Sequence, residues 1–367
     1  MDKILIKNIT IQNPYEKAFK SDVCVENKKV TKIGNNNNNN NIETDSFELI
    51  DGSKKVLSYG LIDRHTHGGY GCNFNTCNED ELQNYLINAK KHGIVAVLPT
   101  IMTDDVQNIN KQIALFKNVK SKGAKILGIH LEGPFINPQK KGIHPEKCIL
   151  EPTVENLNKF DTDFIKVVTY APELDKNGEF LSELKKRQII PSIGHSTATY
   201  QQGMDAITNG AKQITHLFNA LRPIHHREPS VITAALNSND VGVEIIADLE
   251  HIHKAILEMV FKLKPKDKIF LISDSLPISY SNAKEDFFGG QKIFYDGKKA
   301  TSKDGVLAGS TLFLDDIYKK ISDFVDFKDF IGYASLNIAK SLGIKGFDTI
   351  KTGTDFEDLV IWDKNCF

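Results

Sequence analysis

The centre of the chain alternates continuous apolar runs with longer amphipathic segments. The amphipathic segments include residues 79–92, 104–122, 197–210 and 253–264, each long enough for a helix that crosses between parallel strands. Strands that are apolar throughout are buried on both faces, and eight such β-α units predict a (β/α)8 TIM barrel, an α/β fold. An open, doubly wound sheet is the alternative. The expected strands are residues 60–65, 94–101, 124–133, 164–172, 188–195, 213–219, 241–248 and 268–274.

The two ends of the chain follow a different pattern. Residues 4–11 and 23–30 alternate apolar and polar positions, as half-buried antiparallel strands do, and residues 358–363 have the same character. We therefore predict a small β-sandwich domain formed from both termini, with the barrel between them. The expected boundaries are residues 1–57 and 343–367 for the small domain and residues 58–342 for the barrel. The asparagine run at residues 35–41 is expected to be a loop insertion.

Composition narrows the class of protein. The 367 residues are 40% hydrophobic and 25% charged, with a net charge of -1, which is typical of a soluble globular chain. There is no basic cluster for nucleic acid, no apolar run of about 18 residues for a membrane span, and no signal peptide at the start. We therefore expect a cytoplasmic protein with no nucleic-acid or membrane partner. The five cysteines form no Cys-x-x-Cys pair, which argues against a thiolate zinc site.

Polar side chains collect where the predicted strands end. A barrel enzyme places its chemistry at the carboxyl ends of its strands, so these positions are candidates for an active site. A single histidine or carboxylate there is usually a cap or a salt-bridged residue. Agreement in position and ligand type at five strand ends is harder to attribute to chance. The residues are His65 and His67, Glu132, His195, His216 and Asp274.

These residues and their neighbours resemble the N-acetylglucosamine-6-phosphate deacetylase family of the amidohydrolase superfamily. The resemblance implies a distorted, metal-dependent (β/α)8 TIM barrel with a small β domain from both termini. It also implies hydrolysis of N-acetylglucosamine 6-phosphate, a phosphorylated amino sugar, to glucosamine 6-phosphate and acetate. It covers nearly the whole chain in order, through His65-Thr66-His67, residues 128–135, Gly194-His195-Ser196, residues 215–220, residues 226–229, and Asp274.

The resemblance also implies a metal centre. Glu132, His195 and His216 match the ligands of the main divalent ion, and a carboxylate with imidazoles suits zinc or iron. His65 and His67, with Glu132 bridging, match the ligands of a second ion. We therefore expect one or two divalent ions per subunit, and the presence of both histidines favours two.

The remaining matched positions have catalytic and substrate-binding roles in the family. Asp274 is expected to take a proton from water activated by the ion and to return it to the departing amine. His251 and His144 are expected beside the sugar and the developing oxyanion. The expected phosphate site consists of Asn219, Ala220, His226 and Arg227. In dimeric members of the family the segment around Arg227 reaches the neighbouring subunit, so we expect a homodimer.

Two other functions remain open at this point. A dihydroorotase-like or adenine-deaminase-like amidohydrolase uses similar ligands at strand ends, but does not account for Arg227 or for residues 131–134. A non-catalytic scaffold with the same fold is the second alternative. Its expected signature is the loss of ligand residues, and none of the matched ligands is lost.

Overall fold

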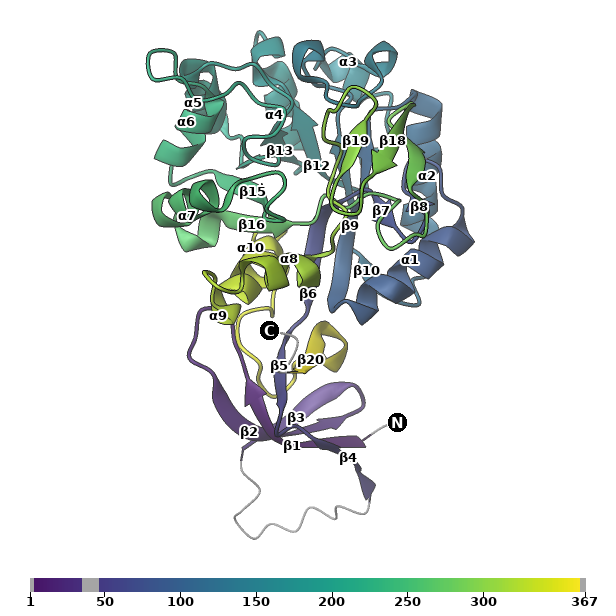
Figure 1. Cartoon of the computed structure of the whole chain (residues 1–367), viewed down its shortest axis with the longest axis vertical. Helices are drawn as coiled ribbons and strands as arrows, with labels where there is room; N and C mark the ends of the chain where they lie inside the picture. Colours follow the sequence, from purple (N-terminus) through teal and green to yellow (C-terminus); the bar gives the residue numbers. More distant parts are fainter. Residues whose placement is uncertain (1–2, 35–45, 364–367) are drawn as a thin grey trace.

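A nearly closed barrel of parallel strands forms the larger part of the molecule (Figure 1). The computed structural model describes residues 3–34 and 46–363. The last and first barrel strands meet where the Asp274 N–H donates a hydrogen bond of 2.8 Å to the His65 carbonyl. The TIM-barrel prediction is confirmed, and the open-sheet alternative is wrong. In spatial order the barrel strands are β6 (Leu61–Thr66), β9 (Ile94–Met102), β11 (Ile129–Glu132), β12 (Ile165–Tyr170), β13 (Ile190–Ile193), β14 (Gln213–Ile214), β15 (Gly242–Ile246) and β16 (Ile269–Ile272).

Helices cover the outside of the barrel. The first one starts where the Asn78 side chain accepts the Glu81 N–H while the Glu81 side chain accepts the Asn78 N–H, a reciprocal cap that satisfies two free donors. Its Leu82 and Leu86 lie on the buried face, so the helix packs against the barrel wall. The barrel helices are α1 (Glu79–Lys91), α2 (Val106–Asn118), α3 (Val154–Leu157), α4 (Glu179–Lys186), α5 (Tyr200–Asn209), α6 (Val231–Asn237) and α7 (Lys254–Leu263).

Further short elements extend the barrel at both of its ends. An antiparallel sheet inserted after β16 lies over the upper part of the barrel in Figure 1, and its Phe288 packs in one apolar cluster with Met102, Ile143 and Leu276. The inserted sheet consists of β17 (Glu285–Phe288), β18 (Gln291–Tyr295) and β19 (Ala300–Ser302). The other elements are β7 (Gly68–Gly69), β8 (Cys72–Asn73), β10 (Lys125–Ile126), α8 (Leu314–Ile321), α9 (Phe327–Ile331), a π-helical turn (Gly332–Leu336) and α10 (Asn337–Ser341).

A separate six-stranded sheet lies below the barrel in Figure 1 and takes strands from both ends of the chain. The strand nearest the C-terminus pairs antiparallel with β5, which runs directly into β6 of the barrel. A second apolar core joins this sheet to the base of the barrel through Ile62 and Phe270. The strands are β1 (Lys3–Ile11), β2 (Phe19–Glu26), β3 (Lys29–Ile33), β4 (Glu48–Asp51), β5 (Lys55–Tyr59) and β20 (Leu359–Asp363).

One strand predicted near the N-terminus is wrong in its extent. Residues 23–30 do not form a single strand, because β2 ends at Glu26 and β3 begins at Lys29. Between them Asn27 and Lys28 have φ of 51° and 62°, the left-handed conformation that a two-residue hairpin turn requires. The predicted asparagine loop lies outside the described residues. Among the residues that are described, no helix has the length and apolar character needed to cross a membrane.

Candidate functional site

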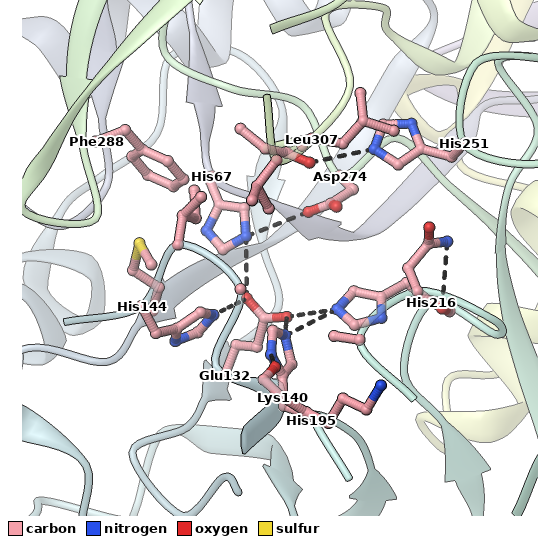
Figure 2. A pocket seen from close by; sticks show the side chains of 18 of the residues that line it. His67, Glu132, Lys140, His144, His195, His216, His251, Asp274, Phe288 and Leu307 are labelled. Atoms are coloured by element: carbon pink, nitrogen blue, oxygen red, sulfur yellow. Dashed lines mark hydrogen bonds and ion pairs between the residues drawn. The ribbon is translucent and has the colours of Figure 1, made fainter. Parts of the chain in front are cut away.

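A cavity of about 340 Å³ opens at the carboxyl ends of the barrel strands (Figure 2). It brings together most of the residues that the sequence predicted. His65 lies behind the cavity wall and is fully buried. The predicted residues that line the cavity are His67, Glu132, His144, His195, His216, Asn219, Ala220, His251 and Asp274.

Three side chains at or just beyond the ends of different strands converge on one point of the cavity. Glu132 is the last residue of β11, and its Oε1 lies 2.9 Å from His216 Nε2 and 3.2 Å from His195 Nε2. The two ring nitrogens are 3.2 Å apart. Ligands about 2.0–2.2 Å from a tetrahedral zinc ion are themselves about 3.3–3.6 Å apart, so this donor set is close to the size that a divalent ion needs.

The orientation of His195 is fixed from behind. Its Nδ1 lies 2.8 Å from the carbonyl oxygen of Lys140, which can only accept a hydrogen bond. The ring proton therefore stays on Nδ1, and the Nε2 lone pair points into the cavity toward Glu132. This arrangement of a ligand and its supporting acceptor is common in metal sites.

The backbone is strained at several of these residues. His195, His216 and Asp274 have φ of 45°, 26° and 51°, in the left-handed region that costs non-glycine residues about 1–3 kcal/mol each. Each stands directly after a barrel strand or within a few residues of its end. The turn that follows the strand aims the side chain into the cavity instead of along the barrel wall.

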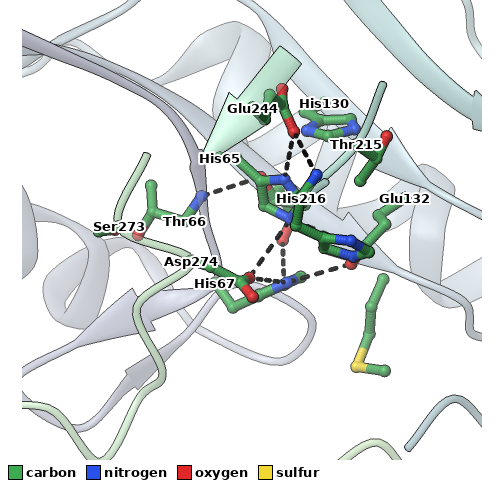
Figure 3. Close-up of polar contacts among 12 residues, drawn as sticks. His65, Thr66, His67, His130, Glu132, Thr215, His216, Glu244, Ser273 and Asp274 are labelled. Atoms are coloured by element: carbon green, nitrogen blue, oxygen red, sulfur yellow. Dashed lines mark hydrogen bonds and ion pairs between the residues drawn. The ribbon is translucent and has the colours of Figure 1, made fainter. Parts of the chain in front are cut away.

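A second group of donors adjoins the first (Figure 3). His67 Nε2 lies 3.1 Å from Glu132 Oε2 and 3.2 Å from Asp274 Oδ1. His65 Nε2 lies 3.3 Å from the same Asp274 oxygen and 3.6 Å from Glu132 Oε1, and it makes no hydrogen bond although it is buried. Imidazole nitrogens facing shared carboxylates, one of them without a partner, fit a second cation.

Charges in this cluster support one another. Burial opposes ionisation of the carboxyls, but the neighbouring histidines outweigh it, so the pKa of Glu132 lies well below its usual value and that of Asp274 is lowered. Burial likewise opposes the charged form of His65, but Glu132 and Asp274 raise its pKa well above the usual value. Asp274 is therefore ionised at neutral pH and able to accept a proton.

His251 and His144 both reach the cavity, with different partners. His251 Nδ1 donates to Asp248 at 2.8 Å, and its Nε2 lies 3.2 Å from the Ala308 carbonyl oxygen. Burial opposes the charged form of His251, but Asp248 outweighs it and the pKa is raised. His144 packs edge-on against His195, and burial together with that ring lowers its pKa to about 4. At neutral pH His144 is therefore uncharged.

The predicted phosphate site is only partly assembled within one chain. Asn219 and Ala220 line the cavity, but Arg227 and His226 are exposed and do not. The Arg227 guanidinium lies 2.7 Å from Nε2 of its neighbour His226. The structure of the single chain therefore brings Arg227 and His226 to each other but not to the cavity.

Sequence reasoning missed two buried charges and one aromatic wall. Glu244 and Arg64 lie beneath the cavity with no exposed surface, 3.3 Å apart, and Phe288 of the inserted sheet lines the cavity beside His67. The signal for Glu244 was available, because a carboxylate inside the otherwise apolar strand β15 must have a buried partner. No pattern in the sequence indicated that residues 285–302 would fold over the site.

Comparison with known proteins identifies the family. Residues 56–366 match the amidohydrolase family. A protein from Bacillus subtilis named N-acetylglucosamine-6-phosphate deacetylase is 34% identical to this chain over 379 aligned residues, which cover 100% of this chain and 94% of that protein. The chain belongs to the N-acetylglucosamine-6-phosphate deacetylase family.

Other members of the deacetylase family agree with this assignment. A human protein of the same name is 30% identical, with 86% of this chain and 82% of that protein covered. The solved structure of the Thermotoga maritima deacetylase superposes with a TM-score of 0.84 at 30% identity, covering 99% of this chain and 96% of that one. The resemblance stated from the sequence is therefore confirmed. Amidohydrolases of this kind depend on a metal, and the buried histidine and carboxylate groups described above could hold it.

Proposed function

We propose that this chain hydrolyses the acetyl amide of N-acetylglucosamine 6-phosphate, giving glucosamine 6-phosphate and acetate. The observation that carries the proposal is the position of the Asp274 carboxylate in one cavity with Glu132, His195 and His216. The Bacillus subtilis relative bears the name of this activity. A scaffold without activity has no reason to keep so many strained and buried polar residues around one cavity.

The metal is the first part of the proposal. Glu132, His195 and His216 would hold one divalent ion, zinc or iron, and His65 and His67 with Glu132 and Asp274 a second. A divalent ion in this position acidifies a water molecule and polarises the amide carbonyl. The two donor groups share Glu132, so the ions would be neighbours.

Asp274 would move the proton. As a carboxylate it accepts the proton of the attacking water, and as a carboxylic acid it then donates that proton to the departing amine. The amine is too basic to leave without it. The same group therefore acts first as a base and then as an acid, and no second acid is required.

His251 and the uncharged His144 would bind the sugar and the developing negative oxygen. Asp248 raises the pKa of His251, which favours positive charge at the cavity wall. Asn219 and Ala220 would contribute to the far edge of the substrate, where the phosphate lies.

Arg227 and His226 would complete the phosphate site from the partner subunit of a homodimer. Both are exposed in the single chain, and a guanidinium binds phosphate through paired hydrogen bonds. The cytoplasmic location likewise stays a prediction.

Acetate release tests the proposal directly. Purified protein is assayed with N-acetylglucosamine 6-phosphate, with the unphosphorylated sugar, and with N-acetylgalactosamine 6-phosphate, because a relative from Escherichia coli O157:H7 named for the last substrate is 30% identical over 83% of this chain. We expect the first to be turned over best, activity to disappear on chelation, and zinc or iron to restore it. No turnover with any divalent metal would refute the deacetylase activity.

A further inference from the structure

Glu244 is a buried carboxylate that the proposed reaction does not use. It lies on β15, and its side chain has no exposed surface. One oxygen, Oε2, is 3.0 Å from His65 Nδ1, on the side of that ring away from the cavity. Figure 3 shows His65 between Glu244 on one side and Asp274 on the other. The His65 ring thus connects Glu244 to the metal centre.

Glu244 is itself held rigidly. Its Oε1 accepts a hydrogen bond of 3.0 Å from Gln213 and lies 3.3 Å from Nε of Arg64. Arg64 is fully buried, donates to the Ser341 hydroxyl at 2.8 Å and faces the Phe270 ring. A buried guanidinium beside a buried carboxylate keeps that carboxylate ionised, because neither charge is stable alone in the interior. An ionised carboxylate accepts hydrogen bonds and donates none.

The fixed acceptor decides where His65 carries its proton. With Glu244 at Nδ1, the neutral ring keeps its proton there and directs the Nε2 lone pair toward Asp274 Oδ1 at 3.3 Å and Glu132 Oε1 at 3.6 Å. A lone pair facing two carboxylates is unfavourable unless a proton or a cation lies between them, and the cation of the proposed metal centre would replace that proton. The opposite tautomer would donate from Nε2 to a carboxylate and could not bind a metal.

We propose that Glu244 is a positioning residue for the second divalent ion: it fixes His65 as an Nε2 ligand, and Arg64 holds Glu244 in place. This inference rests on the metal centre of the proposed function. It means that the contact between Glu244 and His65 determines whether that centre binds one ion or two. Partners that orient a metal ligand typically contribute 10–100-fold to metal affinity.

The test is zinc binding by Glu244→Gln. A carboxamide can accept from Nδ1 or donate to it, so it no longer selects one tautomer. Metal analysis and zinc titration should show the second ion bound about 10–100-fold more weakly and the first ion unchanged. Thr169→Val is the control for loss of a buried polar group, because it removes hydrogen bonds of 2.7 Å to His130 and 2.8 Å to Thr215 but leaves the contact between Glu244 and His65 in place. It should leave both affinities unaltered, and equal losses in the two variants would overturn the inference.

A second pair of variants tests whether Glu244 acts through His65 or through His216, whose N–H lies 3.4 Å from Glu244 Oε2. In a His65→Asn background, Glu244→Gln should leave the affinity for the remaining ion unchanged. A further fall would mean that Glu244 acts through His216, against the inference.

Nitrogen-15 NMR of the zinc-loaded wild type needs no substitution and decides the matter even if Glu244→Gln fails to fold. We expect His65 to be protonated at Nδ1 and metal-bound at Nε2. Protonation at Nε2, or uptake of a single ion in excess zinc, would overturn the inference while acetate release could persist. Two bound ions with no acetate release would instead contradict the proposed function.

Discussion

The metal-ligand cluster and the loop around Arg227 are built in opposite ways. Glu132, His195 and His216 are buried, and their side chains contact one another or the Lys140 carbonyl oxygen, from separate segments of the chain. Arg227 is exposed, with His226, the residue before it, at hydrogen-bond distance from its guanidinium. The groups proposed to break the amide are thus assembled by one chain, whereas the group proposed to select the phosphate is not. Reaction chemistry and substrate selection should therefore respond separately to substitution.

The largest effect is expected where the two donor groups meet. Glu132→Gln removes the carboxylate that faces both His195 and His67 and leaves imidazoles without their counter-charge. We expect loss of both ions and turnover at background level, measured by metal analysis and acetate release. Retention of both ions in this variant would show that metal binding does not depend on Glu132.

Asp274→Asn should separate metal binding from proton transfer. The amide is similar in size but cannot take up the proton, so kcat should fall about 100- to 10,000-fold. The main ion should stay, because its three ligands are unchanged. Full activity in this variant would contradict the role given to Asp274.

The same contrast shows what could be read from the sequence. The ligands at strand ends were predictable because the barrel fixes where strands end, and the apolar runs marked the strands. The run at 213–219 was predicted as one strand, but β14 ends at Ile214. The chain then turns through left-handed residues at His216 and Phe218, and apolar composition carries no signal for that.

Contacts between distant residues were the other gap. The Glu244 carboxylate contacts the His65 ring, although the two residues are 179 positions apart in the sequence. Arg64, which precedes His65 in β6, contacts the same carboxylate. The pattern of apolar and polar positions shows which face of a strand a side chain lies on. It does not show which residue of another strand that side chain contacts.

Arg227→Ala should weaken substrate binding without changing the chemistry. A hydrogen bond to a charged group contributes about 1.5–3 kcal/mol, so KM for the phosphorylated sugar should rise roughly 10- to 100-fold at nearly constant kcat. Turnover of the unphosphorylated sugar should not change. Arg222→Ala is the matched control, since Arg222 lies in the same loop but pairs with Glu228 at 2.7 Å. An equal rise in KM for the control would remove Arg227 from the phosphate site.

Mixing two defective proteins shows whether Arg227 acts across subunits. Arg227→Ala and Asp274→Asn chains, refolded or exchanged together, form mixed dimers in which one site has an intact Asp274 and the partner's arginine. Activity at low substrate should then exceed that of either variant alone. Absence of any gain, with mixed dimers present, would place Arg227 in its own subunit's site.

A smaller effect is expected from His251, which lines the cavity, and its partner Asp248. Because Asp248 raises the pKa of His251, the imidazole keeps its charge above its ordinary titration range, and kcat/KM should fall as pH rises through the raised pKa. Asp248→Asn removes the cause of the shift, so this limb of the pH profile should move to lower pH. A profile that does not move would mean that the His251 charge is not used in the reaction.

The smallest effect concerns strain that has no part in the site. Gln188 has φ of 59° just after α4, and it closes the helix with a pair of hydrogen bonds, Gln188 N–H to Lys185 and Ile189 N–H to Leu184. The side chain is exposed, so replacement by glycine removes strain and little packing. We expect Gln188→Gly to raise the free energy of unfolding by about 0.5–1 kcal/mol in denaturant titrations, with kcat and KM unchanged. Lys186→Gly, at the last residue of the helix, should instead lower the free energy of unfolding, by up to about 1 kcal/mol. The strained residues of the metal centre cannot be replaced by glycine in this way, because their side chains are the ligands and the strained conformation directs them into the cavity. A change in turnover in Gln188→Gly would mean that strain outside the cavity also contributes to the site.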